Sequence, residues 1–498
     1  MEKTTYQSEK QIRLKKLNAL RQAGIDPYPA KAERTHTIAQ AKEKFDQLMQ
    51  KDKEIVLAGR IRSLRGHGGS LFCHFEDGSG KFQAYLKKDV LGERQYQTFN
   101  DYIDVGDFIQ FRGLLFITKK GEPTLKINSW KILTKSLLPL PEKWHGLADV
   151  EKRYRQRYLD LVANEEVKQI MTTRSLIVQT VRETLLNKKF IEVETPVLQP
   201  IYGGGLARPF VTHHNALDMP LYLRISTELY LKRLVVGGYE NIFEIAKLFR
   251  NEGVDHYHNP EFTLLETMSA YHDYTYNMDL VEEIYEKVAQ KIHGAKEIVY
   301  QDVKINFNRP WRRLSMVEAI REATGVNVLK AYTDKGLKKI TTELKMPTTE
   351  ISNLKTAGEL TQHIFEAKVE KTLIQPTIVF DFPVETSPLA KRNPNDPRFV
   401  ERFEHYIYGH EHGNNYSELN DPEDLRQRFV AEKKKQQAGF EEAHQTDEDF
   451  LTAIEHGMPP TTGASVAIDR LVMLMTNTES IKDVIFFPTM KLKTTHEE

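Results

Sequence analysis

The sequence predicts an α+β protein in which a small β-barrel precedes a larger domain that mixes strands and helices. Five short runs of apolar, β-branched and aromatic residues lie between residues 55 and 133, with turn residues between them. A proline-bearing stretch, Leu137–Trp144, then gives the best domain boundary. Beyond it, strand-like runs alternate with amphipathic helices such as Leu280–Ile292. These three observations together define the fold class.

Length and composition describe an ordinary globular protein with room for a sizeable core. The 498 residues correspond to about two to four domains, and 40% of them are hydrophobic and 28% charged. Lysine plus arginine and aspartate plus glutamate both number 70, so the net charge is zero. A protein that binds nucleic acid over its whole surface would be basic. Any contact with a polyanion is therefore expected to be local.

The cysteine content and the hydropathy pattern indicate a cytoplasmic location. Cys73 is the single cysteine, which excludes a disulfide framework and a thiolate zinc site and suits a reducing compartment. We interpret Cys73 as a small, half-buried apolar residue in a strand. The polar, charged N-terminus predicts no signal peptide. The lack of an apolar run of about 18 residues predicts no membrane-spanning segment.

Residues 1–54 are expected to form an N-terminal helical extension. Ile12, Leu14, Leu17 and Leu20 follow near-helical spacing, with basic residues between them. Gly24 and the two prolines that follow it end the first helix. The charged face of this helix is either simply solvated or contacts phosphate groups.

Residues 55–136 are predicted to form a five-stranded Greek-key barrel of the oligonucleotide-binding (OB) type. The expected strands are Ile55–Ile61, Ser70–Phe75, Lys81–Leu86, Phe108–Gly113 and Thr124–Ile127. Turns such as Asp77–Gly80 and Lys120–Pro123 separate them. On this segment alone, another small β-barrel with no role in nucleic acid binding is the alternative.

Residues 137–160 are expected to form a linker and residues 161–498 the larger domain. The strand-like runs of this domain are Tyr222–Ile225, Ile242–Phe249, Phe262–Ala270 and Thr377–Phe382. A more polar, helical stretch at about residues 316–364 is interpreted as an insertion packed on the domain.

An arginine at the junction of a strand and a turn is the most informative feature of the larger domain. The segment Phe249–Gly253 is followed by Glu261–Thr263. We expect Asn241–Arg250 and Glu261–Tyr271 to form a hairpin. Arg250 then lies at its loop end, where a planar, always charged guanidinium can bind carboxylate or phosphate oxygens. For a lone arginine, a surface salt bridge is the structural alternative.

A second arginine, Arg470, lies near the C-terminus. In Gly463–Arg470, small residues lead into an apolar helix that continues from Leu471. Small residues let the backbone approach a flat ring closely, and the arginine can stack on that ring. Two arginines that frame one pocket suit the binding of ATP and the stabilisation of charge when its α-phosphate is attacked.

Side-chain alternation in two expected strands points to a pocket for a cation. Successive strand residues face opposite sides, so shared faces are predicted for Phe262, Leu264, Glu266 and Met268 and, within Gly413–Leu419, for Asn414, Tyr416 and Glu418. Glu266 and Glu418 would then meet in one pocket, for which a compact ammonium on a flexible stem is a natural ligand. The alternative is that both carboxylates pair with structural arginine or lysine residues.

Two further carboxylates, Glu404 and Glu411, flank the aromatic run Tyr406–Tyr408. Carboxylates beside a nucleotide typically hold Mg²⁺, which takes oxygen ligands and bridges phosphates. The spacing alone equally fits two solvated glutamates.

Together these motifs resemble the bacterial-type class II lysine–tRNA ligases (lysyl-tRNA synthetases) along nearly the whole chain. The two arginine segments are similar to motifs 2 and 3 of class II synthetases, and the Pro196 segment is similar to motif 1. Further matching strings are Tyr154–Leu161, Phe190–Pro196, Arg208–Asp218, Glu228–Arg233, Ser387–Lys391 and Ser417–Asp421. The resemblance implies an antiparallel sheet flanked by helices, an anticodon-binding OB-fold barrel and a symmetric homodimer.

The resemblance also implies roles for individual residues. ATP would be bound by Arg250, Glu252, His258, Phe262, Glu404 and Arg470, with Arg250 and Arg470 as the catalytic pair and with Mg²⁺ held by Glu404 and Glu411. The amino acid would be bound by Gly204, Glu228, Arg250, Glu266, Met268, Asn414, Tyr416 and Glu418. Anticodon bases would be stacked on and hydrogen-bonded by Phe72, Gln83 and Glu122.

The implied reaction has two steps and uses lysine, ATP and tRNA. The lysine carboxylate attacks the α-phosphate of ATP, which releases pyrophosphate and leaves lysyl-adenylate. A terminal ribose hydroxyl of the tRNA then takes the acyl group. No side-chain nucleophile is required, because positioning and charge stabilisation suffice.

Several pocket positions depart from the family pattern. They are Tyr257 and His410 in place of arginines, Met268 in place of a tyrosine, and Asn415, Ser465 and Ala467 in place of glycines. The leading interpretation is an active lysine–tRNA ligase with a modified pocket. The second is a paralogue that activates another amino acid or a lysine analogue, or that resists a pocket-directed inhibitor. The third is a catalytically silent RNA-binding or regulatory protein.

Overall fold

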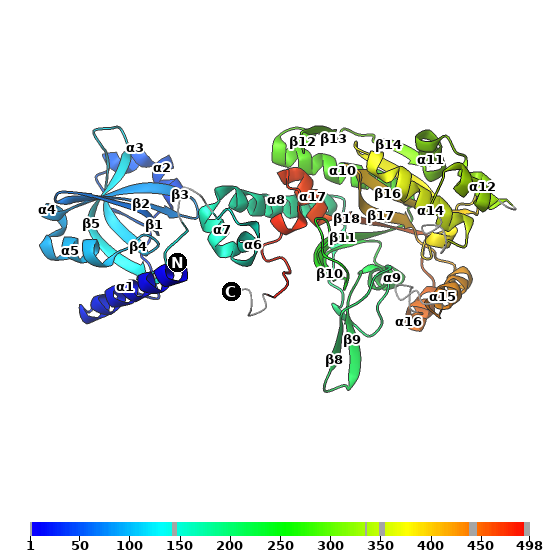
Figure 1. Cartoon of the computed structure of the whole chain (residues 1–498), viewed down its shortest axis with the longest axis horizontal. Coiled ribbons are helices and arrows are strands. Elements are labelled where there is room, and N and C mark those ends of the chain that lie inside the picture. The colour runs from blue at the N-terminus through cyan, green and yellow to red at the C-terminus, as the bar shows by residue number, and fades with distance from the viewer. Residues whose placement is uncertain (1, 142–146, 334–335, 348–353, 438–445, 493–498) are drawn as a thin grey trace. The chain divides into compact units, whose positions relative to one another are not determined.

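The chain forms two units in a computed structural model that describes residues 2–141, 147–333, 336–347, 354–437 and 446–492. The units are Met1–Ala148 and Asp149–Glu498 (Figure 1). Part of the boundary expected at Leu137–Trp144 and parts of the insertion expected at residues 316–364 lie outside the described residues.

The described part of the N-terminal extension is helical. It contains α1 (Glu2–Gln22), α2 (Ile38–Glu43) and α3 (Phe45–Gln50). α1 ends before Gly24, whose φ of 75° is a left-handed conformation that glycine adopts without strain. Thr37 caps α2 in a capping box with Gln40. Leu20 and Ile38 are buried in the apolar cluster of the barrel, so the extension packs on it.

The first unit contains a closed barrel in the strand order β1-β2-β3-β5-β4. Its elements are β1 (Ile55–His67), β2 (Ser70–Asp77), β3 (Gly80–Lys87), α4 (Lys88–Leu91), α5 (Glu93–Tyr102), β4 (Phe108–Ile117) and β5 (Pro123–Thr134). β3 and β5 are parallel, and the other neighbours are antiparallel. Alternate residues such as Cys73, Phe75 and Phe111 fill the interior. The predicted five-stranded OB barrel is thus confirmed.

The second unit is built around an eight-stranded sheet in the order β14-β15-β16-β17-β18-β11-β10-β6. The strands are β6 (Ile191–Glu192), β10 (Asn241–Phe249), β11 (Glu261–Ala270), β14 (Arg312–Ser315), β15 (Thr377–Pro383), β16 (Phe399–Ile407), β17 (His410–Ser417) and β18 (Thr461–Ala467). Among these neighbours, β6–β10 and β14–β15 are parallel and the rest antiparallel. The predicted hairpin of β10 and β11 and the α+β class are confirmed.

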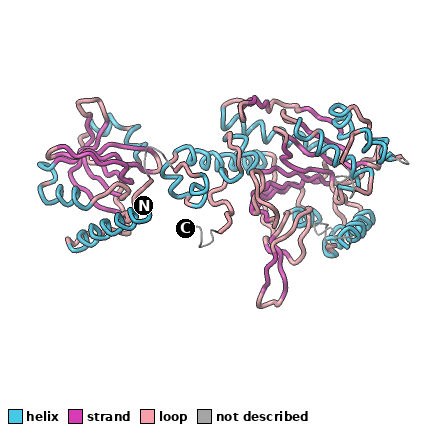
Figure 2. The backbone as a smooth tube through the Cα atoms, in the orientation of Figure 1, coloured by secondary structure: helices cyan, strands magenta, loops and turns pink. Residues whose placement is uncertain are grey.

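Helices cover one face of the sheet and part of the other (Figures 1 and 2). The main apolar core lies between the sheet and α8 (Glu165–Asn187), α10 (Tyr274–His293) and α17 (Ile468–Thr476). A second core joins β15 to α11 (Met316–Thr324) and α14 (Ala357–Lys368). A third core surrounds Phe450 and joins α9 (Glu228–Val236), α15 (Pro422–Gln437) and α16 (Glu448–Glu455). Part of the remaining face is left open.

Short elements complete the second unit. They are α6 (Val150–Arg155), α7 (Arg157–Ala163), β7 (Leu198–Gln199), β8 (Val211–His214), β9 (Met219–Leu223), β12 (Glu297–Tyr300), β13 (Val303–Asn306), η1 (Val328–Tyr332), α12 (Gly336–Glu343), η2 (Glu370–Thr372), η3 (Val384–Thr386) and η4 (Ile481–Asp483). The strand expected over Tyr222–Ile225 ends earlier, at Leu223, because the backbone of Arg224 bonds to residues outside its sheet. Within the described residues, we find no helix with the length and apolar character that crossing a membrane requires.

Candidate active site

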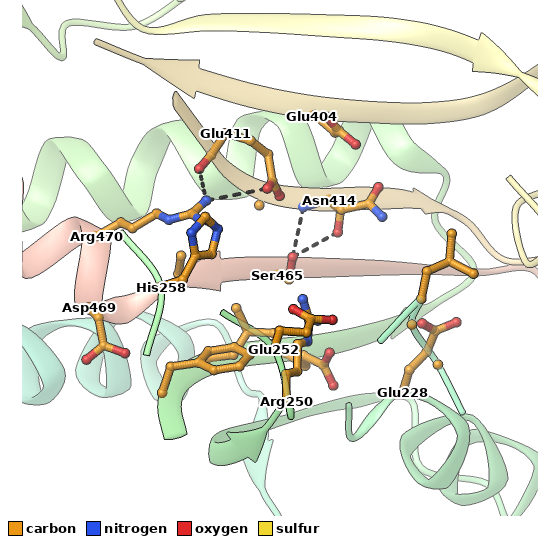
Figure 3. A pocket seen from close by; sticks show the side chains of 18 of the residues that line it. Glu228, Arg250, Glu252, His258, Glu404, Glu411, Asn414, Ser465, Asp469 and Arg470 are labelled. Carbon is orange, nitrogen blue, oxygen red and sulfur yellow. Dashed lines mark hydrogen bonds and ion pairs between the residues drawn. The ribbon is translucent and has the colours of Figure 1, made fainter. Parts of the chain in front are cut away.

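A cavity of about 390 Å³ opens on the uncovered face of the sheet. Leu264 and Glu266 line it, whereas Leu265 between them belongs to the main core. β11, β16, β17 and β18 contribute to its walls together with the loop between β10 and β11 (Figure 3). Of the residues predicted for the site, the lining includes Gly204, Glu228, Arg250, Glu252, His258, Phe262, Glu266, Glu404, Glu411, Asn414, Tyr416 and Arg470.

Arg250 follows β10 directly and points into this cavity (Figure 3). Its backbone N–H donates to the Pro260 carbonyl at 2.9 Å and so closes the base of the loop. Its guanidinium carbon lies 5.1 Å from the centre of the Phe262 ring. Burial lowers the pKa of Arg250, and its Nε–H has no hydrogen-bond partner among the described residues. A buried, incompletely bonded guanidinium is suited to bind an anion.

Arg470 lies in the first turn of α17 and faces the same cavity. Its guanidinium donates to the Glu411 carbonyl and lies 3.4 Å from the Glu411 carboxylate. On its other side, a nitrogen of Arg470 lies 3.3 Å from Nε2 of His258. The Nδ1 atom of His258 is in turn 2.7 Å from Asp255. The two arginines that the sequence pointed to therefore face one space.

The carboxylates of Glu404 and Glu411 project from neighbouring strands, β16 and β17 (Figure 3). Burial and the charge of Glu411 raise the pKa of Glu404 to about 7, while Arg402 opposes the shift. Arg402 and the Tyr406 hydroxyl both donate to Glu404. Among the described residues, no group of three or more histidine, cysteine, aspartate or glutamate side chains is arranged to hold a metal.

At the other end of the cavity, Glu266 is held by the residues that lead into α9. Its carboxylate accepts hydrogen bonds from the Ser226 hydroxyl at 2.9 Å and the Thr227 backbone N–H at 2.7 Å. The Thr227 hydroxyl also donates to it. Burial raises the pKa of Glu266 and these donors counteract the shift. The carboxylate is thus fixed in orientation at the cavity wall.

Lys232 is a charged residue of this region that the sequence did not single out. Its Nζ atom lies 2.5 Å from Oε1 of Glu228 and 2.5 Å from Oε2 of Glu418. The spacing of Glu228 and Lys232, four residues apart on a helix, was a visible signal for the first contact. The second contact joins segments distant in the sequence, and nothing local indicated it.

Glu418 and Met268 belong to this end of the site but do not line the cavity. β17 ends at Ser417, so Glu418 follows the strand instead of continuing it. Met268 shares the face of Glu266, yet it lies one step further along β11 and is buried in the third apolar core. Both side chains lie close to Gly463. If this residue carried a Cβ atom, that atom would lie 2.4 Å from Glu418 Oε1 and 3.2 Å from Met268 Cε.

Two of the departures from the family pattern contact each other. The rings of Tyr257 and His410 lie 3.8 Å apart, with their planes inclined by 30°. Burial lowers the pKa of His410 to about 4, and the ammonium of Lys371, 3.3 Å from its Nδ1 atom, acts in the same direction. A neutral aromatic pair therefore stands where the family pattern has two cations.

Three other departures lie where β16, β17 and β18 meet. The buried side chain of Asn415 accepts from the Ser465 backbone N–H at 2.8 Å and donates to the Phe403 and Gly413 carbonyls. The Ser465 hydroxyl bonds to both backbone groups of Asn414, at 2.9 Å each. Ser465 and Ala467 also line the cavity. The backbone pairing of β17 with β18 reaches only to Tyr416. Beyond that point, these side-chain hydrogen bonds connect the two strands.

The residues predicted to read the anticodon lie in the first unit, on β2, β3 and the start of β5. The Phe72 ring is 4.8 Å from that of Tyr85. Gln83 is buried and donates to the Thr124 hydroxyl at 2.8 Å. Glu122 lies just before β5, 3.3 Å from Nε2 of His74. Phe72 keeps an incompletely buried ring, as a base-stacking platform requires.

Comparisons with known proteins identify the family of both units. Residues 149–491 match the family model for class II tRNA synthetases (D, K and N), and residues 55–133 match the model for OB-fold nucleic acid binding domains. The chain is 52% identical over 480 residues to a lysine–tRNA ligase of Carboxydothermus hydrogenoformans, covering 96% of this chain and 97% of that protein. It is 50% identical to one of Thermoanaerobacter pseudethanolicus, covering 97% and 96%, and 48% identical to one of Bacillus subtilis, covering 97% of each chain.

Proposed function

The chain belongs to the class II lysine–tRNA ligases, and from that membership we propose how its own residues carry out the ATP-dependent attachment of lysine to tRNA. The proposal assigns the cavity of the second unit to lysine and ATP and the barrel to the anticodon. It keeps lysine as the amino acid despite the departures around the cavity.

The charge of the buried end of the site is the observation that carries the proposal. Glu228, Glu266 and Glu418 contribute three carboxylates there, and Lys232 is the one ammonium that pairs with any of them in the described structure. Ionisation of all three groups would leave two negative charges without a cationic partner, and burial accordingly raises the pKa of Glu266 and of Glu418. A diamino acid brings two ammonium groups, and it satisfies both charges once its carboxylate pairs with Arg250.

In the first step, Arg250 and Arg470 act on the developing charge. Arg250 is placed to hold the lysine carboxylate and the α-phosphate together, which fixes the attacking oxygen next to phosphorus. Its Nε–H has no other partner in the described structure and becomes bonded when this anion binds. Arg470, with His258 beside it, stabilises the leaving phosphates. The Phe262 ring offers a flat apolar surface to the adenine.

We assign a magnesium site to Glu404 and Glu411. Two neighbouring carboxylates, one with a pKa raised by burial and by the other's charge, form a donor set that a divalent cation would stabilise. Bound Mg²⁺ would neutralise charge on the phosphates, which would supply the remaining oxygen ligands. Arg402 positions Glu404.

In the second step, the tRNA terminus takes the lysyl group while the barrel holds the anticodon. Phe72 would stack on a base, with Tyr85 supporting its ring. Glu122, anchored by His74, would accept hydrogen bonds from a base edge. Gln83, which donates to Thr124, would use its remaining amide groups in the same way.

We also propose a homodimer that acts in the cytoplasm, where translation takes place. Exposed large apolar side chains recur along the segment that includes the motif 1 string: Leu186, Ile191, Val197, Leu198, Leu206, Val211 and Leu217. Apolar side chains exposed in such number favour a protein partner, and a second copy of the chain is the partner that the family resemblance implies. Sedimentation of the purified protein as a dimer is the expected result.

Amino-acid-dependent exchange of pyrophosphate into ATP tests the proposal. Lysine should support exchange, ornithine should do so more weakly, and norleucine, which lacks the second ammonium, should fail. Exchange with a different amino acid and not lysine would favour the paralogue interpretation. Absence of exchange with every amino acid would favour a catalytically silent protein.

A further inference from the structure

The ammonium of Lys232 is almost fully buried, which is unusual for a charged side chain. Its side chain is 1% exposed and sits between Glu228 on α9 and Glu418 after β17, at 2.5 Å from each. The rings of Tyr416 and Phe450 lie 5.5 and 5.9 Å from Nζ. Two carboxylates and two aromatic faces are the surroundings that a protein would offer to an ammonium ligand.

The Lys232 ammonium contacts one oxygen of each carboxylate. Lys232 contacts Oε1 of Glu228 and Oε2 of Glu418. Oε1 of Glu418 is buried and has no hydrogen-bond partner among the described residues. A buried carboxylate oxygen without a donor is costly, and a bound cation relieves that cost.

We propose that Lys232 is a specificity-determining residue: it holds the Glu228 and Glu418 carboxyl groups in place, it favours their ionised forms, and when all three acidic groups ionise it limits the uncompensated charge of the pocket to the two units that a diamino acid neutralises. The inference rests on the proposed function of this cavity and extends it to a residue that does not touch the substrate's reacting atoms. Lys232 is therefore a positioning residue for the side-chain end of the amino acid.

The pKa shifts agree with this arrangement. Burial alone would lower the pKa of Lys232, but Glu228 and Glu418 raise it above its ordinary value, so it stays charged. Burial, together with the charges of Glu228 and Glu266, raises the pKa of Glu418 to about 8, and Lys232 counteracts this rise. Without Lys232, Glu418 would ionise only at still higher pH. The titratable groups that act on this ammonium are Glu228 on α9 and Glu418 after β17, with the Tyr416 ring also beside it. Glu266 on β11 acts on Glu418 and raises its pKa.

The test is lysine-dependent exchange of pyrophosphate into ATP with Lys232→Met, which keeps the length of the side chain and removes its charge. The KM for lysine at pH 7 should rise about 10-fold or more, the loss expected for one interaction with a charged group, while the KM for ATP changes less than about twofold. The pH at which kcat/KM for lysine reaches half its maximum should move upward relative to the unmodified protein.

Lys135→Met is the matched control. Lys135 is also fully buried between two carboxylates, those of Asp104 and Asp107, but it lies in the first unit. This variant should lose thermal stability and leave the KM for lysine and its pH profile unchanged. If Lys232→Met does not fold, Lys232→Gln removes the same charge with a smaller change in polarity, and the same shifts are expected.

An unchanged KM for lysine and an unchanged pH profile in a folded Lys232 variant would overturn the inference. A fall in kcat alone, with equal effects on ATP and lysine, would mean that Lys232 is only structural. Failure of the unmodified protein to exchange lysine would instead refute the proposed function, so the two failures are distinguishable.

Discussion

Replacing the buried Asn415 by glycine tests whether its side chain joins the three strands that carry the candidate site. The side chain is 0% exposed. Its Oδ1 atom accepts the Ser465 N–H at 2.8 Å, and its Nδ2 atom donates to the Phe403 and Gly413 carbonyls at 3.3 and 3.2 Å. The substitution removes all three bonds and leaves a void between β16, β17 and β18.

The expected loss of stability follows from these contacts. Leaving the buried Ser465 N–H without a partner costs about 1–3 kcal/mol. The greater freedom of glycine in the unfolded chain adds about 0.5–1 kcal/mol. Together, Asn415→Gly should lower the free energy of opening of these strands by about 1.5–4 kcal/mol.

Native-state hydrogen–deuterium exchange, read from peptides that cover β17 and β18 of the full chain, measures this free energy locally. Asn395→Gly is the control, because Asn395 is exposed in the loop before β16: it introduces the same glycine without removing buried bonds, so it should lower the value by no more than about 0.5–1 kcal/mol. A change below about 1 kcal/mol for Asn415→Gly would refute the reasoning, since it would show that water or the relaxed backbone replaces the three bonds.

Three further outcomes are expected. Gly463→Ala should raise the KM for lysine about 10-fold or more and spare ATP, because the new Cβ would lie 2.4 Å from Oε1 of Glu418, the carboxyl group whose other oxygen contacts Lys232; equal kinetics for both substrates would contradict this. Phe72→Ala should weaken tRNA charging by about 5- to 150-fold through the loss of a stacking platform, and lysine-dependent exchange should stay constant; a fall in both activities would mean that the barrel does not read tRNA independently. Because burial raises the pKa of Glu404 to about 7, the carboxylate is protonated below that pH and ionised above it. kcat/KM for ATP at limiting Mg²⁺ should therefore rise as the pH passes upward through about 7, and the same pH profile in Glu404→Gln would count against the assignment.

The sequence predicts the local part of the site well. Alternation along one strand was enough to place Phe262, Leu264 and Glu266 on a common face, because the hairpin of β10 and β11 is a local structure. The position of Arg250 at the loop end followed from the same hairpin. These features depend on residues that are neighbours in the chain.

Contacts between segments that are distant in the sequence could not be predicted from local patterns of residues. The pairing of Lys232 with Glu418 and the stacking of Tyr257 on His410 each join residues more than 150 positions apart. The alternation rule also extended Gly413–Leu419 past its true end, since β17 stops at Ser417. Strand ends depend on hydrogen bonds to other segments, which periodicity does not record.

The buried guanidinium of Arg250 links ligand binding to the stability of the fold. A ligand that binds the folded chain and not the unfolded one stabilises the fold, and an anion that pairs with Arg250 would do so. A ligand present at about 100 times its Kd adds about 2.7 kcal/mol to the free energy of unfolding. Lysine and ATP should accordingly protect the folded protein against protease, to a degree that rises with their concentrations.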